Sequence, residues 1–275
     1  MQNLHIATNS YPWSTFYRRE GRSFEADLDA GLAAVAASGA DGYEGAFTTP
    51  EELEQTAGLL RRHGLEMRSL YSGATLHDPE KVDENISRVL AVAATARSVG
   101  TRIVVVNPAP LQWGGPADKN DAQLCIQAEA LARLGREIKA LDMVLAYHNH
   151  DAELRSAARE FHHMMLGTDP GHVSLCLDAH WIYRGSGNSS VALFDVLTLY
   201  GSRVVELHLR QSAAGVWTEA FGDGDIDYHL LAQRVKEHGK PHLVMEQAVE
   251  ESTPVTLGVV EAHRRSFAYA RGIFG

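Results

Sequence analysis

Short apolar runs alternate with longer amphipathic segments along nearly the whole chain. Eight of these runs have the length and composition of buried strands, and they cover residues 4–9, 42–46, 67–72, 102–108, 143–150, 173–180, 203–210 and 242–247. Between them, apolar residues recur every three or four positions, as over 24–35, 82–93 and 124–141. That spacing places them on one face of a helix. The pattern therefore predicts strands and helices in alternation.

This alternation indicates the fold class. Eight strand–helix units within about 250 residues are typical of the (β/α)8 TIM barrel, an α/β fold. No stretch rich in Pro, Gly or Ser divides the chain, so we expect a single domain over residues 1–275. A doubly wound open sheet is the alternative. That fold ordinarily carries a Gly-rich phosphate-binding turn after its first strand, where this chain reads "TNSYPW".

Polar side chains end four consecutive predicted strands. These strands read "MVLAYHNH", "VSLCLDAH", "RVVELHLR" and "HLVMEQ". In each, every second residue is apolar over most of the strand, and the residues between them become polar toward its end. Side chains in a barrel strand alternate between the interior and the helix layer, and active sites lie at the carboxyl ends of the strands. We therefore expect four inward side chains to meet at the barrel mouth: His148, Asp178, His208 and Glu246.

Two imidazoles and two carboxylates form a plausible set of metal ligands. Such a mixture suits Mn, Co, Fe or Zn better than Ca or Mg. The alternative is a hydrogen-bonded core histidine, or an inward carboxylate that pairs with Arg210. Several carboxylates buried close together are costly without a cation, which favours a metal. We expect such a metal to stabilise the negative charge that develops when a proton leaves the carbon beside a carbonyl.

Composition argues against several other classes of protein. The formal net charge of −10 disfavours nucleic acid as a partner, because phosphate binding needs a positive surface. No apolar stretch approaches the roughly 18 residues of a membrane span. The first residues lack the pattern of a signal peptide, so we expect a cytoplasmic protein. Cys125 and Cys176 match no paired metal or redox spacing.

The motifs at the strand ends resemble a known family. The stretches "YHNHDAE", "CLDAHW", "ELHLR", "FGDGDIDY" and "VMEQ" occur in this order. In that order and spacing they resemble the xylose isomerase-like barrel superfamily. The closer resemblance is to its sugar phosphate isomerase/epimerase group, with tagatose 3-epimerase-like enzymes and inosose dehydratase. The resemblance implies one divalent metal held by Glu, Asp, His and Glu on strands five to eight. Three of these ligands match Asp178, His208 and Glu246, but His148 stands where the group has Glu.

The resemblance also implies roles for the site residues. The strand-five and strand-eight glutamates of the epimerases are their acid/base groups, so we expect Glu246 and His148 to be catalytic and His148 to act as ligand or base. The expected cofactor is one divalent ion among Mn, Co, Zn, Fe and Mg, with Mn favoured. The candidate substrate contacts are His150, Arg210, Glu44, Asn107, His180, Trp13 and Trp181.

These inferences predict a metal-dependent sugar isomerase or epimerase that moves a proton through an enediolate. A dehydratase or lyase acting on a keto-sugar or keto-inositol is the first alternative, and a catalytically silent sugar-binding barrel is the second. An abasic-site endonuclease of the same fold uses more histidine ligands, including one on strand four, where this chain has Asn107. The expected partner is a small carbohydrate, with no nucleic acid and no membrane. The resemblance leaves a homo-oligomer as an option.

Overall fold

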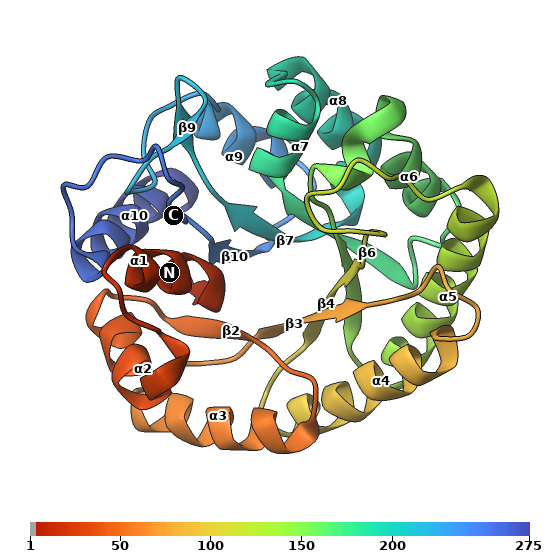
Figure 1. The fold of residues 1–275 in the computed structure, drawn as a ribbon, viewed down its shortest axis with the longest axis horizontal. Coiled ribbons are helices and arrows are strands. Elements are labelled where there is room, and N and C mark those ends of the chain that lie inside the picture. The colour runs from red at the N-terminus through yellow and green to blue at the C-terminus, as the bar shows by residue number, and fades with distance from the viewer. Residues whose placement is uncertain (1–3) are drawn as a thin grey trace.

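The computed structural model describes residues 4–275. Eight parallel strands close into a barrel in the order β1-β10-β7-β6-β5-β4-β3-β2. Their bounds are β1 Ile6–Asn9, β2 Gly42–Ala46, β3 Ser69–Ala74, β4 Ile103–Pro108, β5 Val144–His148, β6 Val173–Asp178, β7 Val204–Leu209 and β10 His242–Met245. In Figure 1 the strands form an inner ring and the helices surround it. The predicted TIM barrel is confirmed.

The helices follow the strands in the predicted alternation. Their bounds are α1 Ser10–Arg19, α2 Leu28–Ala37, α3 Pro50–Arg62, α4 Val82–Ser98, α5 Asp121–Ala140, α6 Arg155–Leu166, α7 Ala179–Gly185, α8 Ser190–Tyr200, α9 Tyr228–Lys236 and α10 Val259–Phe274. A short antiparallel hairpin, β8 Ser212–Ala213 with β9 Val216–Trp217, lies beyond the end of β7. Among residues 4–275, no helix is long and apolar enough to cross a membrane.

Strand pairing decides between the two sheet architectures. β1 pairs in parallel with β10 on one side and with β2 on the other, so the sheet has no open edge. This closure excludes the doubly wound alternative. It also removes the unpaired backbone groups that an edge strand presents.

Four strands end one or two residues earlier than their apolar runs predict, and two of these ends matter for the site. β5 ends at His148 and β6 ends at Asp178. His150 therefore lies in the segment that follows β5, and Trp181 lies in the first turn of α7. The reason is local, because the Asp178 carboxylate caps α7 by accepting a hydrogen bond from the Trp181 amide at 2.9 Å. The chain thus turns from strand to helix at a site residue.

α6 begins in a left-handed turn. Ser156, Ala157 and Ala158 have φ values of 54°, 60° and 56°. Residues other than glycine disfavour this left-handed helical region of φ and ψ by roughly 1–2 kcal/mol each. The turn follows the 3-10 helix Ala152–Leu154, which itself follows β5. The strained backbone therefore lies in the segment that follows the barrel mouth at β5.

Trp13 does not lie with the other candidate substrate contacts. It belongs to α1, it is fully buried, and its ring stacks on His263 of α10 with 4.3 Å between ring centroids. Its Nε1 donates a hydrogen bond to Thr8 Oγ1. The expected substrate contact is therefore corrected: Trp13 packs between helices, because α1 starts at Ser10 and carries the ring into the core.

We expect His263→Leu to weaken the dependence of stability on pH. Burial lowers the pKa of His263 from 6.5 to about 4. The unfolded chain therefore binds this proton below pH 6.5 while the folded chain stays neutral, so the free energy of unfolding falls as the pH drops from 6.5 toward 4. Urea unfolding at pH 7.5 and pH 5 should show a loss smaller by about 2 kcal/mol in the variant. The exposed His238→Leu is the control, and an equal loss in wild type and His263→Leu would contradict the assignment.

Candidate active site

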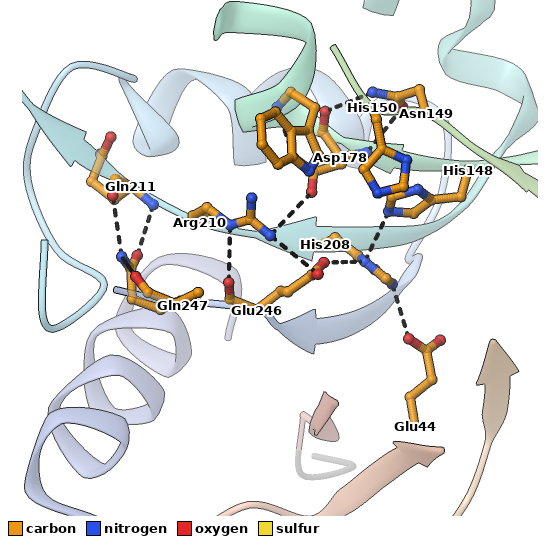
Figure 2. A network of polar contacts seen from close by, with 12 residues as sticks. Glu44, His148, Asn149, His150, Asp178, His208, Arg210, Gln211, Glu246 and Gln247 are labelled. Carbon is orange, nitrogen blue, oxygen red and sulfur yellow. Dashed lines mark hydrogen bonds and ion pairs between the residues drawn. The ribbon is translucent and has the colours of Figure 1, made fainter. Parts of the chain in front are cut away.

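Four side chains from consecutive strands of the barrel meet at its carboxyl end. They are His148, Asp178, His208 and Glu246, from β5, β6, β7 and the end of β10. Each offers one ligand atom, and these atoms lie within 4.8 Å of one another. His208 Nδ1 is 3.1 Å from His148 Nε2 and 2.6 Å from Glu246 Oε2 (Figure 2). The structure thus brings together the four side chains that the strand parity predicts.

The donor set fits a divalent cation. Asp178 is fully buried, and its Oδ2 has no hydrogen-bond partner within the described part of the chain. A buried carboxylate oxygen without a partner is costly, and a cation removes that cost. Burial, together with His150 and His208, lowers the pKa of His148 well below 6.5. The imidazole of His148 is therefore neutral at pH 7 and has a lone pair to offer a metal.

His208 lies at the centre of the cluster. Burial alone would lower its pKa, but the acidic groups around it, Cys176 and the carboxylates of Glu44 and Glu246, raise the pKa well above 6.5. Burial would raise the pKa of Glu246, but Arg210 and His208 lower it to about 2. Positive charge within the cluster therefore stabilises its carboxylates, and a proton on His208 or a metal ion can supply that charge.

Asn149 braces the Asp178 ligand from the neighbouring strand. Its Nδ2 donates to the Asp178 carbonyl and its Oδ1 accepts from the Asp178 amide, both at 3.2 Å. Asn149 is fully buried and lies one residue past β5, with its side chain on the opposite side from His148. The two hydrogen bonds hold the backbone that presents the carboxylate.

Removing this brace should weaken metal binding. For Asn149→Ala we expect a metal Kd about 10–100-fold higher, because Asp178 loses the partners that orient it. Metal titration followed by calorimetry measures the Kd. Asn120→Ala is the control, since it removes the side chain that caps α5 outside the cluster and should lower stability without changing the Kd. An unchanged Kd in Asn149→Ala would show that the strands alone hold Asp178.

Glu44 lies deeper in the barrel than a substrate contact at the mouth. It is 1% exposed, its Oε1 is 3.3 Å from His208 Nε2, and its Oε2 accepts a hydrogen bond from Ser69. Burial and the charge of Glu206 raise its pKa to about 7. β2 presents Glu44 beneath His208 in Figure 2, and the contact of Glu44 with substrate hydroxyls stays a prediction.

Glu206 is a site residue that was not among the candidates. Its Oε1 is 3.3 Å from His208 Nε2, and its Oε2 is 2.8 Å from His242 Nδ1. It precedes His208 by two residues on β7, so the same parity rule places it inward. A carboxylate on the far nitrogen of a ligand histidine fixes the tautomer that leaves Nδ1 free for a metal.

The remaining candidates surround the ligand cluster unequally. His150 lies 4.7 Å from His148 between ring centroids, and burial lowers the pKa of His150 to about 4. His180 is fully buried, with Nε2 3.1 Å from Ser212 Oγ. Arg210 is also fully buried, and the Trp181 ring lies 4.9 Å from its guanidinium carbon. These four residues form the mouth of the site.

Asn107 supports the site from behind and does not reach its mouth. Its Nδ2 donates to the His148 carbonyl at 3.1 Å and to Glu153 Oε1 at 3.2 Å. Glu153 also accepts a hydrogen bond from the His150 amide, and burial raises its pKa to about 7. Glu153 follows β5 in the 3-10 helix, where strand parity gives no signal for its role.

Trp217 is the other residue without a signal in the sequence. It lies in the β8–β9 hairpin, and its ring is 4.4 Å from the guanidinium carbon of Arg210. β8 and β9 have two residues each, too few to show an alternating pattern, so the sequence does not predict this hairpin. Tyr11, in the first turn of α1, covers the same guanidinium at 5.5 Å.

Comparison with solved structures gives neighbours at low sequence identity. A sugar phosphate isomerase/epimerase from Parabacteroides distasonis is 16% identical with a TM-score of 0.75, over 98% of this chain and 94% of that one. D-allulose 3-epimerase from Methylomonas sp., in complex with D-allulose, is 15% identical with a TM-score of 0.73 over 99% and 98%. A xylose isomerase-like TIM barrel protein from Mycobacterium smegmatis, in complex with magnesium, is 14% identical with a TM-score of 0.73 over 99% and 97%. At these identities the likeness shows a shared fold.

Comparison of the sequence identifies a family for this chain but no individual curated relative. No curated protein sequence matches the chain. The model of one family, described as xylose isomerase-like TIM barrel, matches residues 32–267. That match starts within α2 and ends within α10, and it includes β5, β6, β7 and β10, which present the cluster of His148, Asp178, His208 and Glu246. The chain belongs to the xylose isomerase-like TIM barrel family.

Proposed function

We propose that this chain is a divalent-metal-dependent enzyme that moves a proton at the carbon beside a carbonyl of a sugar or related polyhydroxy compound, as an isomerase or epimerase. The observation that carries the proposal is the buried cluster of His148, Asp178, His208 and Glu246 at the barrel mouth, with its ligand atoms within 4.8 Å. Active sites of TIM barrels lie at this end. Neighbours of the same fold that are named as sugar isomerases and epimerases support the substrate class.

The four ligands suit a divalent transition metal, and we propose manganese first among Mn, Co, Zn, Fe and Mg. When bound, such an ion supplies positive charge that stabilises the negative charge developing on substrate oxygens. A neighbour of the same fold in complex with magnesium supports a divalent ion in general. His208 would offer Nδ1 to such an ion, because Glu206 holds its Nε2.

The side chains around the metal site would carry out the proton transfer. Glu246 presents Oε2 toward His208 and Oε1 toward Arg210, 3.1 Å from Nη2. Its low pKa keeps it ionised at neutral pH, as a base must be. We propose Glu246 as the proton carrier and His148 as a ligand that can also take a proton. The rings of Trp181 and Trp217 pack against the mouth and limit the access of water.

A lyase is the second candidate, and one observation favours it. His148 stands on β5 opposite Glu246, so the site has one carboxylate base and one neutral imidazole in place of two carboxylates. Elimination needs only one such carboxylate, because Glu246 can take the proton from carbon and pass the same proton to the leaving hydroxyl, which departs as water. Analysis of the products distinguishes the two reactions, since only a lyase releases water.

Two measurements test the proposal together. Elemental analysis after dialysis against Mn, Co or Zn should give about one ion per chain. Incubation with a panel of ketoses, aldoses and keto-inositols in deuterated water should exchange the proton beside the carbonyl of at least one compound, as seen by NMR. A chain that takes up metal without exchanging any proton would be a sugar-binding barrel. A chain that binds no metal would overturn the proposal.

A further inference from the structure

Arg210 is a fully buried cation at the mouth of the site. It follows β7 by one residue, and its Nε donates to the Glu246 carbonyl at 3.0 Å. The Tyr228 hydroxyl donates to the Arg210 carbonyl, so the backbone is held as well. Figure 2 shows the guanidinium between Asp178 and Glu246. The side chain therefore has one fixed position.

The outer nitrogens of this guanidinium, Nη1 and Nη2, are buried without a hydrogen-bond partner among residues 4–275. Nη2 lies 3.1 Å from Glu246 Oε1 and 4.0 Å from Asp178 Oδ2, so its contacts are ionic. Buried donors are satisfied in nearly all proteins, and a pair of them on one planar fork fits the two oxygens of a carboxylate. The fork therefore has two donors to offer a bidentate partner.

Aromatic rings enclose the same fork. The guanidinium carbon lies 4.4 Å from the Trp217 ring centroid, 4.9 Å from Trp181 and 5.5 Å from Tyr11. Trp217 Nε1 and His180 Nδ1 are further buried atoms without a hydrogen-bond partner. Rings around the guanidinium exclude water and strengthen any charge-assisted hydrogen bond that it makes. The surroundings favour a desolvated ionic contact.

Charge balance indicates the sign of the partner. A divalent cation would offset the carboxylates of Asp178 and Glu246, the two acidic groups next to the guanidinium, while the carboxylate of Glu206 is taken up by His208 and His242. Arg210 would then keep a buried charge whose outer nitrogens have no hydrogen-bond acceptor among the described residues. An uncompensated buried charge is strongly unfavourable, and one negative charge on the substrate removes the penalty.

We propose that the substrate is a keto sugar acid, with a carboxylate on the carbon next to the reacting carbonyl, and that Arg210 binds this carboxylate. The inference rests on the proposed function. The fork lies within 4.0 Å of the ligand atom Asp178 Oδ2, so the anionic group must sit directly beside the reacting carbons. A phosphate ester adds a linking oxygen and a second negative charge, which would face Asp178 and Glu246.

The test compares three ketoses that differ only at C1. D-Fructose has a hydroxymethyl group there, 2-keto-D-gluconate has a carboxylate, and D-fructose 1-phosphate has a phosphate ester. Calorimetric titration of the Mn²⁺-loaded protein should show 2-keto-D-gluconate bound at least about tenfold more tightly than the other two, the difference expected of a bidentate charged pair. Arg210→Gln should abolish this preference, and Arg210→Lys should retain a part of it, because Lys lacks the planar fork.

Arg184→Gln is the matched control. Arg184 packs against the same Trp217 ring at 5.0 Å, but Glu250 already pairs with it at 3.0 Å. This variant should keep the preference, and metal content and circular dichroism establish that each variant is folded.

The outcomes separate the two proposals. Equal affinity for the three ketoses in the metal-loaded protein, or a preference that survives in Arg210→Gln, would overturn the inference and leave the proposed function standing. Tighter binding of fructose 1-phosphate would replace the carboxylate by a phosphate and overturn it too. A preference for the carboxylate in a chain that takes up no metal would support the anion site and overturn the proposed function.

Discussion

Asp178→Asn is expected to abolish metal binding and to lower kcat/KM by about 10³-fold or more while leaving the fold intact. Asp178 contributes a buried carboxylate oxygen to the cluster, and an amide carries no charge to offset the ion. The substitution spares the other role of this residue. Its Oδ1 caps α7 by accepting from the Trp181 amide, and asparagine caps helices as well as aspartate does.

The control for this variant is a second aspartate with the same structural task. Asp227 caps α9 through a hydrogen bond from the Leu230 amide at 2.9 Å, but it takes no part in the ligand cluster. Asp227→Asn should keep its metal and its rate. Elemental analysis and the rate of solvent-proton exchange measure both effects. An Asp178→Asn protein that still holds one ion per chain would exclude Asp178 as a ligand.

His148→Ala is expected to raise the metal Kd by at least about 100-fold, because a neutral imidazole within the cluster is lost. The burial of His148 makes this a sensitive test. Its pKa lies well below 6.5, so it offers a lone pair throughout the neutral range. Titration with Mn²⁺ and elemental analysis of the purified protein report the change directly.

His150→Ala is the matched variant, since it removes an imidazole 4.7 Å away that is not part of the cluster. It should retain the metal, and any loss should appear in substrate binding. If His148→Ala also retains one ion but no longer exchanges solvent protons, His148 is a base and not a ligand. Equal metal loss in both variants would point to a general disturbance of the mouth.

Much of the site could be predicted from the sequence because the direction in which each strand residue points depends on its local position in the strand. Strand parity depends only on neighbouring residues, and the carboxyl ends of all eight strands meet at one rim. The inward positions of Asp178, His208 and Glu246 therefore follow from the strand patterns, and the structure brings them together. The same rule also reaches Glu206, two residues before His208.

The alternation of residues along a strand shows which side chains face the interior, but it does not show how deep in the barrel they lie. Glu44 and Glu246 both face the interior, yet Glu44 lies beneath His208 and Glu246 lies beside it at the mouth. The tilt and stagger of strands in a closed barrel set these levels, and they are properties of the whole sheet. Trp13 shows a similar limit, because the early start of α1 turns its ring away from the mouth.

The sequence by itself predicted the alternation of eight strands with helices, the end at which the polar residues gather and the chemical types of the four candidate ligands. Only the tertiary structure decided which side chains lie against one another. The enclosure of Arg210 by Trp217 and Tyr11 joins a hairpin after β7 to the first turn of α1. Contacts between segments about 200 residues apart depend on how the barrel closes, and no local periodicity encodes that closure.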